Sequence, residues 1–141
     1  MPFEYLESVA DAFLRGTGET PEEAFAEAAR AMTNLMVDVD TLLLREEVPL
    51  SGEAETLDLL LVEWLSAILA AKDLERIYLS AFEIEVSEAA SGTVKVAGTG
   101  WGERLDLSRH DPRLEVKGVS LSGLKVVEED GRWIAQCVVD I

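Results

Sequence analysis

The clearest structural pattern in the sequence lies near the end of the chain, at Glu129-Asp130-Gly131-Arg132-Trp133-Ile134-Ala135-Gln136-Cys137-Val138-Val139. Asp130-Gly131 is typical of the tight turn of a β-hairpin, and the apolar run after it is typical of a strand. Leu124 and Val126 lie before the turn and supply the strand that pairs with it. The chain is therefore expected to end in an antiparallel hairpin.

Two helical patterns precede this hairpin. Thr20 can cap a helix, Pro21 suits its first position, and Glu23 completes a capping box, so we expect a helix that ends near Val37. A second helix is expected from about Thr56 to Ala71. Its apolar residues recur at three- and four-residue spacing: Leu57, Leu60, Leu61, Trp64, Leu65 and Ile68. We interpret both apolar stripes as core faces rather than as ligand sites.

Alternating apolar residues predict the remaining strands. They fall near residues 3–9, 42–50, 82–86, 94–96, 105–107 and 114–119. Pro49 lacks the N–H that a central strand needs, so its segment is expected at a sheet edge. The whole pattern predicts one α+β domain spanning residues 1–141, in two layers, with two helices packed on a largely antiparallel or mixed sheet.

The charge limits the possible partners. The 141 residues include 12 Lys and Arg against 28 Asp and Glu, which gives a formal net charge of -16. Such a surface repels phosphate backbones, so tight direct binding of nucleic acid is not expected. Basic proteins and divalent cations are the natural partners, although acidity can also serve solubility alone. Because no membrane span or signal peptide is apparent, we expect a cytoplasmic protein with no membrane partner.

Two apparent motifs do not support catalysis or phosphate binding. Gly98-Thr99-Gly100-Trp101-Gly102 lacks the Lys-Ser/Thr ending of a phosphate loop and is interpreted as a tight turn or bulge. Cys137 is the one cysteine and His110 the one histidine. Because a thiol in a strand is expected to be buried and unreactive, we disfavour a Cys-His nucleophilic pair.

Three carboxylates occupy unusual positions. Asp11 follows Ser8-Val9-Ala10 after the first strand, Asp38 lies just beyond the first helix, and Asp140 ends the last strand. If they converge, they offer the hard oxygen ligands that suit Ca²⁺ or Mg²⁺, and the terminal carboxylate of Ile141 can add another. The alternative is that each is an ordinary solvated surface group.

Several segments together resemble the archease family. They cover essentially the whole chain in order: Phe3-Glu4-Tyr5-Leu6-Glu7-Ser8-Val9-Ala10-Asp11, Gly16-Thr17-Gly18-Glu19-Thr20-Pro21-Glu22-Glu23-Ala24-Phe25, Leu35-Met36-Val37-Asp38, Gly100-Trp101-Gly102-Glu103 with Ser108-Arg109-His110, Leu114-Glu115-Val116-Lys117-Gly118-Val119, and Val138-Val139-Asp140-Ile141. The chain departs from the family where Ser8 replaces a usual histidine, and at Ser120-Leu121-Ser122.

The resemblance implies an accessory role rather than a reaction of the chain's own. Archeases assist GTP-dependent RNA ligases of the RtcB type in tRNA splicing, by promoting guanylylation of the ligase and repeated turnover. It further implies that Asp11, Asp38 and Asp140 hold a divalent cation. Lys117 would lie beside them, and Lys117 and His110 are the candidates for contact with the ligase or a nucleotide.

Two other functions remain open at this point. One is a stand-alone metal-dependent hydrolase that uses the same aspartates, for which His110 is the only evident candidate base. The other is a chaperone-like binding module that needs no metal.

Overall fold

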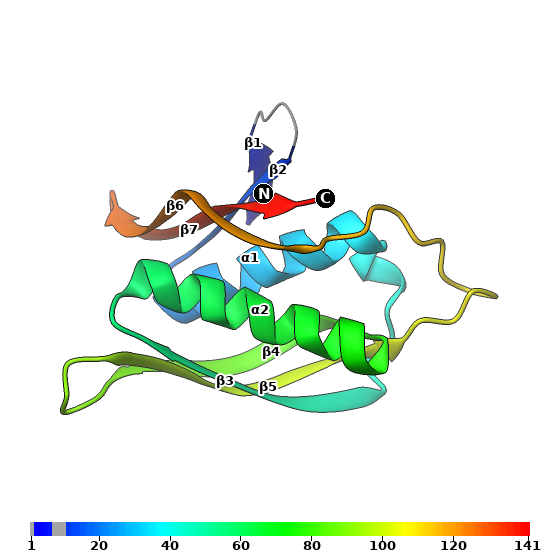
Figure 1. Cartoon of the computed structure of the whole chain (residues 1–141), viewed down its shortest axis with the longest axis horizontal. Helices are drawn as coiled ribbons and strands as arrows, with labels where there is room; N and C mark the ends of the chain where they lie inside the picture. Colours follow the sequence, from blue (N-terminus) through cyan, green and yellow to red (C-terminus); the bar gives the residue numbers. More distant parts are fainter. Residues whose placement is uncertain (1, 7–10) are drawn as a thin grey trace.

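The structure, a computed structural model, describes residues 2–6 and 11–141 (Figure 1). Within these residues the chain forms seven strands, two α-helices and one short 3₁₀ helix. In chain order they are β1 (Phe3–Leu6), β2 (Ala12–Gly18), α1 (Pro21–Met36), the 3₁₀ helix η1 (Val39–Thr41), β3 (Glu46–Ala54), α2 (Leu57–Glu75), β4 (Ile77–Glu88), β5 (Val94–Arg104), β6 (Gly118–Glu129) and β7 (Arg132–Asp140).

The strands form two antiparallel sheets that enclose the helices. One sheet has the order β1-β2-β7-β6 and the other has the order β3-β5-β4. Both helices contact strands of both sheets, and Figure 1 shows them lying between the two. The expected α+β class, with two helices packed on antiparallel sheet, is confirmed, but the helices lie between two sheets, so the domain has three layers rather than the expected two. The strands are divided between two sheets because α2 buries residues around much of its circumference, which needs apolar cover on two sides.

Local sequence fixes where α1 begins and how closely it packs. Thr20 Oγ1 accepts a hydrogen bond from Glu23 N at 3.1 Å, and Glu23 Oε2 accepts one from Glu19 N at 2.6 Å, so the expected capping interactions form. Gly16 in β2 faces the helix, where an added Cβ would lie 2.3 Å from Ala28 N. Only glycine allows this approach. Neither α1 nor α2 is long and apolar enough to cross a membrane.

The glycine-rich segment 98–102 is not a turn. It lies inside β5, with β3 paired on one side and β4 on the other, so the expectation of a tight turn there was wrong. An irregularity in register does occur beside it, in β4 between Leu79 and Ala81. The glycines provide space rather than a bend, because a Cβ on Gly100 would lie 2.9 Å from both Leu50 Cδ1 and Leu79 Cδ1.

The strand boundaries differ from expectation in three other places. Residues 105–117 lie outside the strands and form a loop that projects from one end of the molecule (Figure 1). The strand expected at 105–107 was therefore wrong, and the strand expected from Leu114 begins only at Gly118. β3 begins at Glu46 rather than at Leu42, and it pairs only with β5, which confirms the edge position indicated by Pro49. The expected place of Val9 in the first strand lies outside the described residues.

Candidate functional site

The register of the first sheet brings Asp11, Asp140 and Lys117 to one end. Ala12 of β2 pairs with Val139 of β7, so Asp11 and Asp140 are the next residues along two neighbouring strands. On the other side of β7, Gly118 pairs with Asp140, and Lys117 N donates to Asp140 O at 2.7 Å. Asp140 and Lys117 are exposed and Asp11 is half-buried. Residues that are far apart in sequence therefore bring two carboxylates and one ammonium group to the same end of this sheet.

Asp38 has a different local role. It caps η1, with its Oδ1 accepting from Asp40 N at 3.0 Å. Its Oδ2 lies 3.8 Å from Arg113 Nη2, while Arg113 Nη1 donates to Asn34 O at 2.9 Å. Arg113 thus supplies a positive charge both to Asp38 and to the C-terminal end of α1, where a cation is favourable. Sequence reasoning missed Arg113, although an aspartate just after a helix indicates that a compensating cation is needed.

The described residues do not present an assembled metal site. In residues 2–6 and 11–141, no group of three or more His, Cys, Asp or Glu lies close enough together to hold a metal ion. The donors are of the right chemical kind for Ca²⁺ or Mg²⁺, because carboxylate oxygens are hard ligands. The carboxylate of Asp38, however, is already paired with Arg113, and Ile141 follows Asp140 at the exposed chain end. Metal binding by Asp11, Asp38, Asp140 and Ile141 stays a prediction.

His110 is buried in a polar network around Glu103. Its ring is fully buried, and its Nδ1 accepts a hydrogen bond from Asp106 N at 2.9 Å. Because Nδ1 is an acceptor, the proton lies on Nε2, which donates to Glu103 Oε1 at 3.0 Å. Both ring nitrogens are thereby occupied. A direct contact of this imidazole with a partner, or service as a hydrolytic base, would require the ring to leave its pocket.

Glu103 joins three segments of the chain. Besides His110, its carboxylate accepts from Leu43 N at 3.1 Å and from Arg109 Nη2, and Arg45 Nη1 lies 3.8 Å away. We call these five residues the Glu103 network. A buried carboxylate is stable only when its oxygens are paired in this way. The network therefore fixes the 105–117 loop and the segment before β3 against the end of β5.

The first turn of the loop is held by its own hydrogen bonds. Ser108 N donates to Asp106 Oδ1 at 3.0 Å, and Ser108 Oγ donates to the same oxygen at 2.6 Å. Both hydrogen bonds lower the pKa of Asp106, and the bond from the Ser108 hydroxyl contributes more than the bond from its backbone N–H. The carboxylate stays ionised and the turn stays closed at neutral pH.

Cys137 lies inside β7 and has no exposed surface. Burial raises the pKa of its thiol to about 12. A thiol with such a pKa is a poor nucleophile at neutral pH, because almost none of it is thiolate. The expectation of a cysteine buried in a strand is confirmed.

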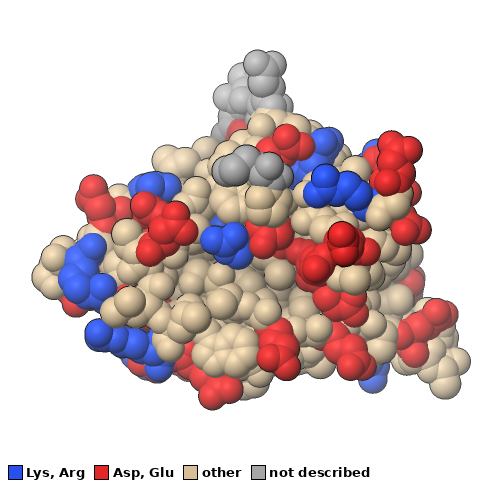
Figure 2. All heavy atoms as spheres, turned by 180° about the vertical axis from the view of Figure 1, so that it is seen from behind, with Lys and Arg blue, Asp and Glu red and all other residues tan. Residues whose placement is uncertain are grey.

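Charge is unevenly distributed over the surface. Figure 2 shows carboxylates spread over one face, with several basic side chains gathered on the left, toward the end where the 105–117 loop projects. Seven of the twelve basic residues lie in the segment 103–117 or contact it: Arg45, Lys72, Arg76, Arg104, Arg109, Arg113 and Lys117. The rest of the surface is correspondingly more acidic.

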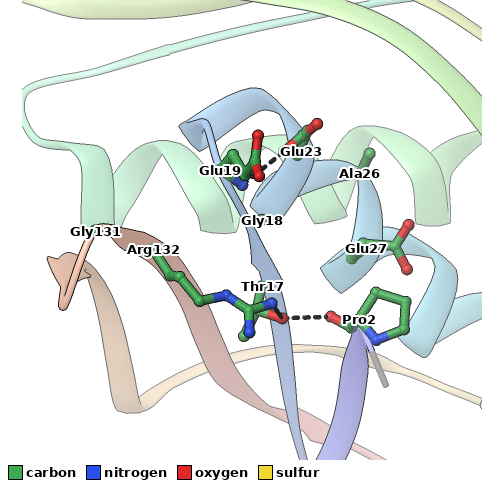
Figure 3. A pocket seen from close by; sticks show the side chains of 9 residues that line it. All are labelled: Pro2, Thr17, Gly18, Glu19, Glu23, Ala26, Glu27, Gly131 and Arg132. Carbon is green, nitrogen blue, oxygen red and sulfur yellow. Dashed lines mark hydrogen bonds between the residues drawn. The ribbon is translucent and has the colours of Figure 1, made fainter.

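An open hollow lies at the other end of the first sheet. It has a volume of about 940 Å³, and Glu19, Glu23 and Glu27 line it opposite Arg132 (Figure 3). Part of this lining is engaged structurally, since Thr17 Oγ1 donates to Pro2 O at 3.0 Å and Glu23 caps α1. None of the residues expected to form the site contributes to this hollow.

A family model described as the Archease protein family (MTH1598/TM1083) matches residues 3–141. The chain belongs to the archease family. It is 39% identical over 141 residues to the protein archease of Methanopyrus kandleri, and the match covers 100% of both chains. It is 34% identical over 140 residues to the protein archease of Pyrococcus furiosus, covering 99% of this chain and 98% of that protein.

Two solved structures share its fold. The solution structure of Methanobacterium thermoautotrophicum protein 1598 superposes with a TM-score of 0.86 at 31% identity, and the match covers 99% of each chain. The crystal structure of an archease from Thermotoga maritima, named a possible chaperone, gives a TM-score of 0.61 at 17% identity, covering 96% of this chain and 94% of that one. The second likeness concerns the fold alone.

The two departures from the archease pattern fall in different places. Ser8 lies outside the described residues. Ser120-Leu121-Ser122 lies in β6, where the register with β7 shifts between Ser120 and Lys125. Ser122 N donates to Ser120 Oγ at 3.1 Å, and Leu121 is exposed. The altered residues therefore form an irregular surface strand close to Lys117.

Proposed function

We propose that this chain is an accessory protein that activates a GTP-dependent RNA ligase of the RtcB type in tRNA splicing. It would promote guanylylation of the ligase and allow repeated turnover, without carrying out a reaction itself. Membership of the archease family supports the proposal. The observation that carries it is the placement of Asp11, Asp140 and Lys117 along one exposed end of the β1-β2-β7-β6 sheet.

These side chains suit a protein that works beside an RNA-binding active site. A ligase that holds RNA has a basic surface, and a partner with a net charge of -16 is attracted to it over distance. Asp11 and Asp140 would pair with basic groups of the ligase near its active site. Lys117, which makes no ion pair within the described part of the chain, would contact a phosphate of the bound nucleotide.

The proposal includes a divalent cation, Ca²⁺ or Mg²⁺, at the same end of the sheet. Asp11, Asp140 and the Ile141 carboxylate would be its ligands, joined by Asp38 if Arg113 is displaced. Because the described residues do not assemble three such ligands, the contacts proposed between this chain and the ligase do not depend on the cation. Titration calorimetry of the full chain with each cation tests this part. Binding heat that is lost in Asp140→Asn supports it, and no heat at millimolar cation contradicts it.

The accessory role is tested by measuring guanylylation of the ligase from the same organism under multiple-turnover conditions. We expect the wild-type chain to increase the rate and Asp140→Ala to increase it much less, with the fold unchanged, because the side chain of Asp140 is exposed. Glu129→Ala is the matched control, since Glu129 is an exposed carboxylate in the same sheet, near the opposite end. If all three proteins stimulated guanylylation equally, Asp140 would not be part of the functional site.

A metal-free binding module is the second candidate. It is favoured by the ion pair between Asp38 and Arg113, which already provides a cation where the metal was expected. Full stimulation of the ligase, together with no calorimetric signal for Ca²⁺ or Mg²⁺, would favour this second candidate.

A further inference from the structure

Exposed leucines gather at the end of the molecule from which the 105–117 loop projects. Leu43, Leu44 and Leu107 are 43%, 58% and 71% exposed. We call these three residues the leucine surface. Single exposed leucines are common, but three on two neighbouring segments are compatible with a surface that a partner covers.

The Glu103 network holds these two segments together. Leu43 N donates to Glu103 Oε1, and His110, which closes the turn containing Leu107, donates to the same oxygen. Asp106 and Ser108, on either side of Leu107, are hydrogen-bonded to each other. The leucines are therefore presented from a fixed backbone. A preformed apolar surface binds with a smaller entropic cost than one that must first become ordered.

Charge distinguishes between two kinds of occupant. A second copy of this chain would bring together two molecules of net charge -16, which repel each other. Seven of the twelve basic residues lie in the segment 103–117 or contact it, so this end is less acidic than the rest of the surface. A large basic protein is attracted by the acidic remainder and can cover the leucines at the same time.

The same loop also connects this surface to the candidate site. Arg113 of the loop reaches Asp38 and the end of α1, and Lys117 at its end bonds to Asp140. A protein bound across the loop would therefore lie next to the carboxylates. This continuity links the two surfaces to one partner.

We infer that the leucine surface is the docking surface for the RNA ligase. This inference rests on the proposed function. Leu43, Leu44 and Leu107 would provide the affinity for the ligase, and the end of the sheet that carries Asp140 would activate it. Loss of the leucines should thus weaken binding while leaving stimulation possible at high concentration. Loss of Asp140 should reduce maximal stimulation with less effect on affinity.

The experiment measures the dissociation constant for the purified ligase from the same organism, and stimulation of guanylylation as a function of concentration. The variant is Leu44→Ser combined with Leu107→Ser. The control is Leu59→Ser, because Leu59 is 39% exposed in the first turn of α2, about 24 Å from the loop end of that helix. We expect the double variant to bind at least about tenfold more weakly and the control to bind within about twofold of wild type.

The possible outcomes separate the two proposals. If the wild type stimulates the ligase and the double variant binds as the control does, the docking surface is wrong and the proposed function stands. If the wild type neither binds nor stimulates the ligase, both are wrong. Sedimentation of the wild type as a dimer that the double variant abolishes would assign the surface to a second copy and overturn the inference.

Discussion

Replacing Glu103 with Gln tests how strongly the network fixes the loop. The Gln side chain keeps an oxygen for Leu43 N and His110 Nε2, but it places an NH₂ group where Arg109 Nη2 now donates. One charge-assisted hydrogen bond is lost, which is worth about 1.5–3 kcal/mol. Because Arg109 is 37% exposed, water replaces part of that bond, so we expect a loss of about 2 kcal/mol in the free energy of unfolding.

The assay is chemical denaturation, with thermal melting as a second measurement. For a chain of this size, a loss of that magnitude lowers Tm by about 6 °C. Hydrogen exchange should become faster at the amides of Asp106 and His110, which the network now holds, without a matching change in the strands. Glu46→Gln is the control, because the ion pair of Glu46 with Arg104 is exposed and is worth less than about 1 kcal/mol. Equal stability of the two variants would refute a structural role for the Glu103 network.

Three further predictions concern the interior. Leu61→Ala should cost about 2–5 kcal/mol in denaturant unfolding, because the side chain is fully buried; a cost below 1 kcal/mol would contradict its place in the core. Gly16→Ala should cost about 3 kcal/mol, because its Cβ would press on the backbone of α1, whereas Gly118→Ala, with 3.8 Å to the nearest atom, should change stability by less than about 1 kcal/mol. Cys137, with a thiol pKa of about 12, should resist iodoacetamide at pH 8 in the native protein and react in urea, as measured by mass spectrometry; rapid native labelling would refute its burial.

Local signals predicted the helices and the last hairpin well. Thr20 and Thr56 act as the N-caps of α1 and α2, and Asp130-Gly131 forms the turn between β6 and β7. Each of these features depends on residues within one helical turn or one hairpin, so a short window of sequence is enough to predict it. The end of α1 was predicted for the same reason.

Features that depend on contacts between distant segments could not be predicted in this way. The segment Gly98–Gly102 is rich in turn-forming residues, but it lies in a central strand because Leu50 and Leu79 occupy the space beside it. His110 was expected near a partner or nucleotide, yet the structure places its ring in the interior, on Glu103. No local pattern reveals that pairing, because the burial of both residues is set by how the loop folds back on β5.

The candidate site, too, could be predicted from the sequence only in part. Asp11, Asp140 and Lys117 come together through the pairing of β2 and β6 with β7, which the strand patterns indicate only in outline. Asp38 was expected to join them, and that stays a prediction; the structure shows its carboxylate 3.8 Å from the guanidinium of Arg113. Its position after α1 showed that a cation was needed, but not which one would provide the charge.

The accessory role is tested most directly by the number of ligations that each ligase molecule completes with excess RNA and GTP. It should be counted with no addition, with this chain, and with its Asp140→Ala variant at concentrations that saturate binding. We expect many turnovers with the wild-type chain, and close to the unassisted number with Asp140→Ala. An unchanged turnover number with the wild-type chain would contradict the accessory role, and full turnover with Asp140→Ala would contradict the assignment of the site.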